Sequence, residues 1–169
     1  NGSEITFMQL YKGESVDFWA EFTAPAEISP GLTEVTVLAS GQSPATAQKT
    51  RKIDIDIPQI HDLTMVASEG LVTAPADMIT RTVEVELTNN GNDAERFDLE
   101  VTADWRLDAS VSQPMTEEIG AFGDSSSVYV VMPMPYGIRP DTYFITLKAT
   151  SQSDSTFFLT EQIELIVEP

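Results

Sequence analysis

The chain repeats itself at a spacing of 110 residues, and this spacing constrains the fold more than any other feature of the sequence. Residues 13–57 align with residues 123–167 without a gap, and twelve of the 45 aligned positions are identical. The identical pairs are Gly13/Gly123, Ser15/Ser125, Pro25/Pro135, Ile28/Ile138, Pro30/Pro140, Thr36/Thr146, Ala39/Ala149, Gln42/Gln152, Ser43/Ser153, Thr46/Thr156, Thr50/Thr160 and Ile53/Ile163. A repeat of this period indicates a tandem array of one module. The 169 residues hold one whole module and part of another.

The repeated segments alternate apolar and polar residues with a period of two, as in Ile53-Asp54-Ile55-Asp56-Ile57. This alternation predicts half-buried β-strands, and no segment of useful length shows the period of a helix. In the second copy we expect strands at 62–68, 79–88, 94–103, 107–112, 126–132, 142–150 and 157–167. In the first copy we expect them near 5–10, 15–22, 33–40 and 49–57.

Turn residues separate these strands. The segment Asn89–Asp93 tolerates positive φ and predicts the closure of a hairpin. Pro133, Pro135 and Pro140 cannot donate to a central ladder, so 133–141 is expected to cross or to lie at an edge. Seven short strands with such connections favour an all-β, immunoglobulin-like Greek-key β-sandwich in tandem modules. A closed barrel is the alternative.

The repeat divides the chain near Pro58. We expect residues 1–59 to be the rear half of a first β-sandwich repeat, and residues 60–169 to be a complete repeat. The front half of the first copy either precedes Asn1 in a longer protein, which we favour, or comes from another chain by edge addition. A linker as short as 58–62 restricts bending between modules.

Charge and composition exclude several classes of function. The chain carries 9 Lys and Arg against 27 Asp and Glu, a net charge of −18, which argues against binding to nucleic acid or to anionic membranes. It has no cysteine, which excludes thiol catalysis, cysteine-based zinc sites and disulfides. No apolar run approaches the roughly 20 residues that span a bilayer, so no direct membrane insertion is expected in this segment.

Residues 83–99 resemble the core of the NEW3 and CARDB class of domains, with a valine-rich strand, a T-N-x-G-N turn, an aromatic residue and a D-L pair. Trp105 is similar to the class's Trp after the third strand, and 123–125 resembles the opening of the next. The segment 135–143 resembles its proline corner, although Asp141 stands where the first copy has Gly31. The resemblance covers 61–169 and about 5–59. It implies an immunoglobulin- or fibronectin-like module of prokaryotic surface or secreted proteins, without catalytic residues.

Two tryptophans are candidate ligand residues, because aromatic faces stack on sugar rings. For Trp105 we favour a packing role at one end of the sandwich over a sugar platform. Trp19 stands where the second copy has Tyr129, and an aromatic residue in both copies also favours packing.

Asp62, Asp93 and Asp124 are candidate calcium ligands near the ends of modules. We favour a simple hairpin at Asn89–Asp93, because the spacing of a calcium-binding loop is absent. His61 is the only histidine and is interpreted as a linker residue, since nothing beside it completes a catalytic triad.

These observations predict no enzyme activity, no catalytic residue and no required cofactor. The favoured function is a structural, spacer or adhesion module of a larger multi-repeat protein, extracellular or at the cell surface. Its partners would be neighbouring repeats, other surface proteins or glycans. The first alternative is a carbohydrate-binding accessory module of a secreted enzyme. The second is a self-assembling surface or filament subunit that completes its first module by strand exchange.

Overall fold

The computed structural model describes residues 9–17, 19, 21–41 and 48–169. All of its regular structure is β-strand, as the alternating sequence predicts. The strands are β1 (Gly31–Ser40), β2 (Gln48–Ile57), β3 (Leu63–Ala67), β4 (Leu71–Pro75), β5 (Arg81–Asn89), β6 (Phe97–Ala103), β7 (Ser110–Val111), β8 (Asp124–Met132), β9 (Asp141–Ser151) and β10 (Phe158–Glu168). No helix that could span a membrane occurs among the described residues.

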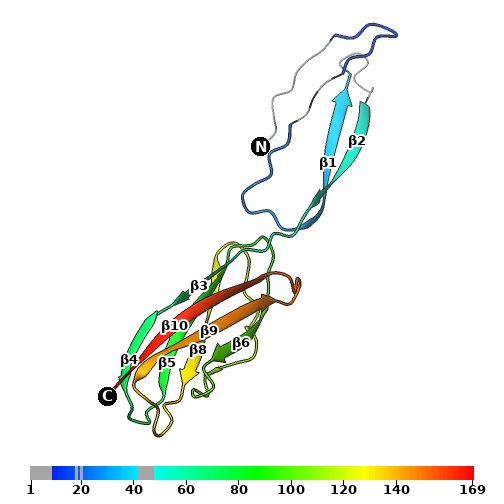
Figure 1. Cartoon of the computed structure of the whole chain (residues 1–169). Helices are drawn as coiled ribbons and strands as arrows, with labels where there is room; N and C mark the ends of the chain where they lie inside the picture. Colours follow the sequence, from blue (N-terminus) through cyan, green and yellow to red (C-terminus); the bar gives the residue numbers. More distant parts are fainter. Residues whose placement is uncertain (1–8, 18, 20, 42–47) are drawn as a thin grey trace.

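Eight strands form a sandwich of two four-stranded sheets, and β1 and β2 form a separate hairpin (Figure 1). One sheet has the order β3-β5-β8-β7 and the other β4-β10-β9-β6. The two sheets are open, so the barrel alternative is wrong. The order of strands and the crossing between sheets are those of an immunoglobulin-like sandwich.

The core of the sandwich consists of the inward-facing residues of both sheets. Val85 and Val128 come from one sheet and Ile145 and Leu165 from the other, and all four are fully buried. Tyr143 at the start of β9 is also buried, and its hydroxyl donates to the carbonyl oxygen of Arg139 at 3.0 Å. A tyrosine that bonds back to the backbone at this corner is a hallmark of immunoglobulin-like folds.

The hairpin repeats the pairing of the last two strands of the sandwich. Gly31 pairs with Ile57, and Asp141 pairs with Val167, each residue lying 110 positions further along. The same offset relates all ten pairs from Gly31↔Ile57 to Ser40↔Gln48. The sequence repeat therefore coincides with a repeat of strand register.

One expected strand is wrong, and a second lies mostly outside the described residues. The described residues of 15–22 form no strand, although their equivalents in the second copy form β8. Strand β8 pairs with β5 and β7, and the hairpin half of the described chain has no equivalent of those two strands. Without a neighbouring strand, the backbone N–H and C=O groups of this segment have no ladder partners. Of the strand expected near 5–10, residues 5–8 lie outside the described residues, and 9–10 are not in a strand.

The segment Asn89–Asp93 does not close a hairpin. It joins β5 to β6, which lie in different sheets, and none of its residues has positive φ. Strand β4 was not expected, because it is short, ends at Pro75, and pairs in parallel with β10 at the edge of its sheet. The chain changes sheets between β3 and β4 around Gly70.

Candidate functional site: the junction of hairpin and sandwich

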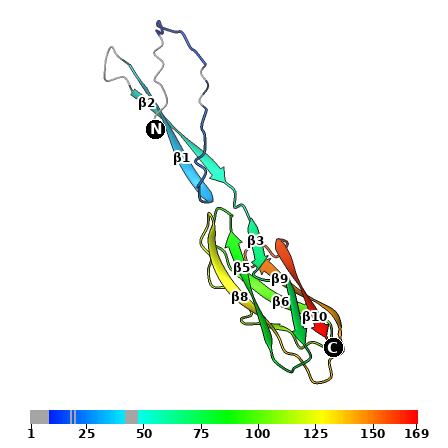
Figure 2. The ribbon, with the colours of Figure 1, turned by 90° about the vertical axis from the view of Figure 1, so that its left-hand side faces the viewer.

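The linker 58–62 lies against the end of the sandwich that faces the hairpin (Figures 1 and 2). It is held there mainly by Asn92, which is 5% exposed. The Asn92 amide nitrogen donates to the Pro58 carbonyl oxygen at 3.0 Å, and its amide oxygen accepts from the Ile60 N–H at 2.7 Å. The Asn92 N–H also donates to the Ile60 carbonyl oxygen at 3.2 Å. One residue of the sandwich thus satisfies three backbone groups of the linker.

Gly91 allows this close approach. A Cβ atom at this position would lie 2.4 Å from the Ile60 carbonyl oxygen, a distance at which no side chain fits. Beside it, Asn89 is fully buried, and its amide donates to the carbonyl oxygens of Asp93 and Ile119 while accepting from the Gly91 N–H. The turn 89–93 is thereby shaped by asparagine side chains, and glycine leaves the space that the linker fills.

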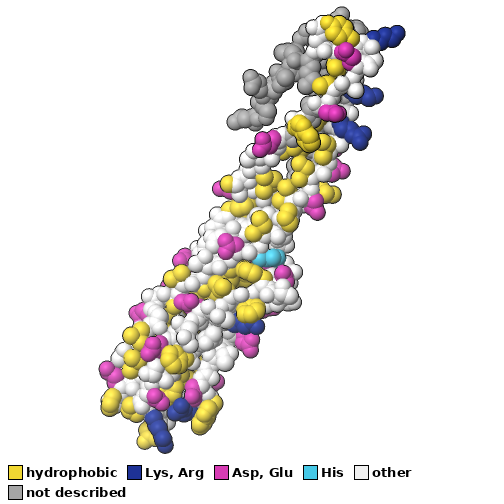
Figure 3. Space-filling model, turned by 45° about the horizontal axis from the view of Figure 1, so that its top comes forward, with side chains coloured by type: hydrophobic (Ala, Val, Ile, Leu, Met, Phe, Trp, Pro, Cys, Tyr) yellow, Lys and Arg dark blue, Asp and Glu magenta, His cyan; other side chains and the backbone are white. Residues whose placement is uncertain are grey.

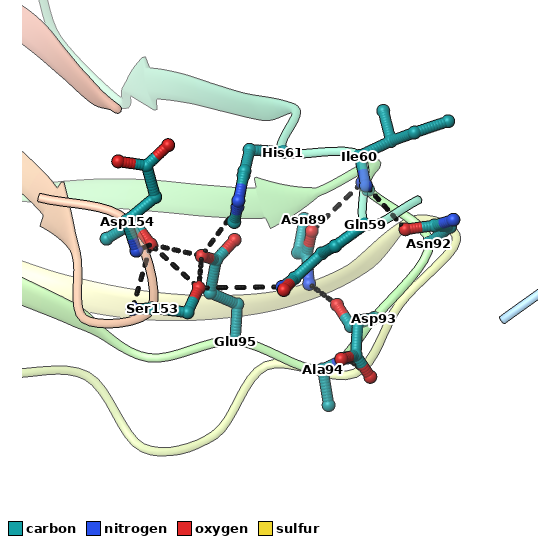
Figure 4. Close-up of polar contacts among 12 residues, drawn as sticks. Gln59, Ile60, His61, Asn89, Asn92, Asp93, Ala94, Glu95, Ser153 and Asp154 are labelled. Atoms are coloured by element: carbon teal, nitrogen blue, oxygen red, sulfur yellow. Dashed lines mark hydrogen bonds and ion pairs between the residues drawn. The ribbon is translucent and has the colours of Figure 1, made fainter. Parts of the chain in front are cut away.

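A second group of contacts involves His61 and Glu95 (Figure 4). His61 Nδ1 lies 2.9 Å from Glu95 Oε1, and the Glu95 side chain is 2% exposed. The hydroxyl of Ser153 donates to the same carboxylate oxygen at 2.6 Å, and the hydroxyl of Ser151 also bonds to it. A buried carboxylate needs such hydrogen bonds or an opposite charge to offset its lost hydration. The linker histidine is therefore one of the partners that stabilise a buried acid in the sandwich.

Two further residues surround the histidine ring. Phe157 stacks on His61 with 5.5 Å between the ring centroids. The pKa of Asp154 is lowered, first by hydrogen bonds from the Thr156 hydroxyl and N–H and to a smaller extent by His61. His61 thus lies between an aromatic ring and two carboxylates, all of which belong to the sandwich.

A serine, a histidine and a glutamate meet at this junction, but their geometry is not that of a hydrolytic triad. In a triad the histidine bonds the acid through one nitrogen and the nucleophilic hydroxyl through the other. Here the hydroxyls of Ser151 and Ser153 both bond to Glu95, and the contact of His61 is also to Glu95. No hydrogen bond joins His61 to either hydroxyl, so the three residue types do not form the relay of a triad. The arrangement holds the linker against the sandwich.

The sequence located this junction only in part. The 110-residue period placed the boundary at 58–62. The asparagines and glycine of 89–93 indicated a connection between strands, but not the one between sheets that the structure shows. The partner of His61 was missed, because Glu95 stands in the polar segment Ala94-Glu95-Arg96 and reads as solvated. Its one signal is its place two residues before the buried Phe97, on the same side of the chain.

Both tryptophans lie outside the core. Trp105 is 89% exposed and Trp19 is 99% exposed, so the packing role expected for them is wrong. Trp105 stands in the loop between β6 and β7, whereas the aromatic side chains of the core are Phe97 and Tyr143. Phe97 takes the position inside the sheet because it continues the alternation of β6, which ends at Ala103, two residues before the tryptophan.

The three candidate calcium ligands do not meet in one cluster. Asp62, Asp93 and Asp124 are exposed, and the described part of the chain contains no group of three acidic or histidine side chains placed to hold a metal. The Asp93 carboxylate accepts from the Ala94 N–H, and that of Asp124 accepts from Gly120 and Ser125. These bonds fix the two carboxylates at the backbone. Calcium binding at module ends stays a prediction.

No family model and no curated protein match the chain. Similar solved structures include a FixG-related protein from Vibrio parahaemolyticus, with 11% identity, a TM-score of 0.48, and coverage of 64% of this chain and 97% of that one. The periplasmic chaperone SfaE matches with 15% identity, a TM-score of 0.42, and coverage of 63% and 58%. Domains 4 and 5 of the S-layer protein SbsC match with 17% identity, a TM-score of 0.40, and coverage of 72% and 59%. The chain thus matches somewhat more than half the length of SfaE.

Proposed function

We propose that the chain is a non-enzymatic spacer or adhesion segment of a larger extracellular or cell-surface protein built from tandem modules of the NEW3 and CARDB kind. The observation that carries this proposal is the fixed junction between hairpin and sandwich. A spacer has to transmit orientation from one module to the next, and the hydrogen bonds of Asn92 and His61 hold the linker in one direction. Its partners are then neighbouring repeats, and other surface proteins or glycans that contact the assembled rod.

The junction leaves few backbone bonds free to rotate between the hairpin and the sandwich. Strand β2 ends at Ile57, and the next residue, Pro58, already accepts a hydrogen bond from Asn92. The proline ring fixes its own φ, and a residue before proline is restricted to extended conformations. Bending between the two parts therefore requires breaking contacts at the end of the sandwich.

The charge of the surface fits an isolated rod. Acidic side chains are spread over both halves of the molecule (Figure 3), and the net charge is −18. Like charge keeps neighbouring molecules apart and repels phosphate backbones. Lateral association through the sheet faces is therefore disfavoured.

Distances between two spin labels test the fixed junction, and the absence of native cysteines makes labelling specific. Labels at Asp56→Cys and Thr82→Cys report the hairpin end and the sandwich. We expect a narrow distance distribution that broadens in Asn92→Ala. The matched control is Asn90→Ala, whose side chain bonds Thr64 and leaves the linker contacts intact. A broad distribution in the parent, or equal distributions in Asn92→Ala and Asn90→Ala, would contradict a spacer with a fixed joint.

A carbohydrate-binding accessory module is the second candidate, favoured by one observation. Trp105 and Trp19 present almost their whole side chains to solvent. Binding to a panel of soluble glycans, measured by titration calorimetry, would support this function if Trp105→Ala or Trp19→Ala removes it. Binding that is absent, or unchanged in both variants, would leave the spacer function alone.

A further inference from the structure

One face of the hairpin is an uncovered copy of a buried face. Inward-facing residues of β9 and β10 are at most 2% exposed, namely Tyr143, Ile145, Leu147, Ala149, Ile163, Leu165 and Val167. Their equivalents at the 110-residue offset are Thr33, Val35, Val37, Ala39, Ile53, Ile55 and Ile57. None of these is buried, and Ile53 is 42% exposed. The register that fully buries the first set leaves the second set partly or fully exposed.

The opposite face of the hairpin is mainly polar. It carries Glu34, Thr36, Lys52, Asp54 and Asp56, beside the exposed Leu32 and Leu38, and Lys52 pairs with Glu34 at 2.8 Å. The hairpin is therefore amphipathic, with one mainly polar face and one apolar face that the described residues cover only in part. A two-stranded ribbon without such a cover is marginally stable in water.

Residues 21–28 lie along one part of the apolar face. With the hairpin they line a groove of about 320 Å³, in which Phe22, Pro25 and Ile28 face Val35 and Ile55. Phe22 is 48% exposed, whereas its equivalent Met132 at the end of β8 is fully buried. The segment therefore covers the hairpin incompletely.

The sandwich shows what covers this face in the complete module. The face of β9 and β10 packs against the sheet β3-β5-β8-β7, in which β8 is paired along its length with β5. Residues 14–22 are the equivalent of β8, and the equivalents of β3, β5 and β7 would precede Asn1. A second copy of this chain offers one such sheet, and its own β9 and β10 already occupy that sheet.

We infer that the apolar face of β1 and β2 is an interface for three strands equivalent to β3, β5 and β7, supplied by the preceding part of the same polypeptide. Residues 14–22 then become the fourth strand and pair with the β5 equivalent. The occupant is a sheet whose strands alternate Val, Leu or Ile with polar residues. This inference rests on the proposed tandem array, and it extends that array by one module in front of the hairpin.

Hydrogen exchange of the 169-residue chain, read by mass spectrometry, tests whether the face is open. We expect fast exchange in 31–40 and 48–57 and slow exchange in 141–151 and 158–168, from a monomer in light scattering. Val35→Asn should leave the thermal midpoint where Thr36→Asn leaves it, whereas Ile145→Asn should lower it. A monomer that protects its hairpin, or a dimer that protects it through a second copy, would overturn the inference.

A longer chain tests the occupant itself. The repeat places Gly13 where Gly123 stands, so residues 60–122 fused directly before residue 13 recreate the order of the complete module in front of the intact residues 13–169. We expect the extended chain to be a monomer whose hairpin amides exchange at least ~100-fold more slowly, as for a segment that opens only with its module. In this chain Val35→Asn should remove the protection, and Thr36→Asn should keep it.

The extended chain overturns the inference if residues 60–122 of the added segment are protected while the hairpin still exchanges fast. If the added segment does not fold, the exchange and the oligomeric state of the 169-residue chain decide alone. These readouts are separate from the junction. Spin-label distances can contradict a fixed joint while the hairpin becomes protected, and the reverse outcome would contradict only the interface.

Discussion

The hairpin β1-β2 and the hairpin β9-β10 have the same register and the same alternation, yet one is exposed and the other forms half of a core. Their amino-acid patterns are not the cause of this difference, since Val35, Ile53 and Ile55 are as apolar as Ile145, Ile163 and Leu165. The difference lies in what each hairpin packs against. The alternation thus specifies which face of a strand is apolar. Whether that face is buried depends on the strands that the rest of the module packs against it.

The largest expected difference between the two hairpins is the loss of unfolding free energy when equivalent apolar side chains are truncated. Leu165→Ala removes a fully buried side chain from the sandwich and should cost about 2–5 kcal/mol of unfolding free energy. Ile55→Ala truncates its equivalent on the uncovered face and should cost less than about 1 kcal/mol. Urea denaturation of both variants measures the difference. Equal losses would mean that the hairpin face is already packed.

Substitution of glycine in the junction comes next. Gly91→Ala places a Cβ against the Ile60 carbonyl and should cost about 1–3 kcal/mol while detaching the linker. Gly70→Ala is the control, because nothing lies within 4 Å of its Cβ, and it should stay within about 0.5 kcal/mol. Thermal unfolding gives the stability, and exchange of the Ile60 amide reports the linker. A harmless Gly91→Ala would show that the linker does not rest on the turn.

The two hairpins also differ in one hydrogen bond, which Tyr143 makes at the start of β9. Tyr143→Phe removes the bond to Arg139 and should cost about 1 kcal/mol. The control is Tyr129→Phe, since Tyr129 is 44% exposed and should tolerate the change. The first hairpin has Thr33 at this position and cannot make the corner. Equal unfolding free energies of the two variants in urea denaturation would show that the tyrosine corner does not stabilise the second hairpin.

The smallest expected effect comes from a partly exposed ion pair in the sandwich. The Arg106 side chain and N–H both donate to Asp104, which lowers the pKa of this carboxyl from 3.8 to about 2. Because the pKa is lowered in the folded state, the pair stabilises the fold above pH 3.8, and this contribution is lost as the pH falls toward 2. Asp104→Asn should therefore unfold like the parent at the lowest pH and slightly more easily at neutral pH. A constant difference at all pH values would contradict this assignment.

Much of this comparison was accessible from the sequence, because alternation and offset are local or periodic signals. They predicted the strands β1, β2, β9 and β10 to within a few residues, and the linker after β2. The contacts that fix the junction were not accessible. Asn92 and Glu95 act through single hydrogen bonds to residues more than 30 positions away, and such bonds leave no period in the chain. The packing role predicted for Trp105 was wrong because the prediction relied on the size of the side chain, whereas the residue lies in a loop beyond the end of β6.

Strand β4 pairs in parallel with β10 over five positions, from Leu71 to Pro75. In the complete module β4 belongs to the entering end of the chain and β10 to its leaving end. Tension applied along the chain then pulls these two strands in opposite directions along their shared ladder. The hydrogen bonds of that ladder carry the load together rather than one after another. The same edge pairing that the sequence concealed is the part of the sandwich that would resist being stretched.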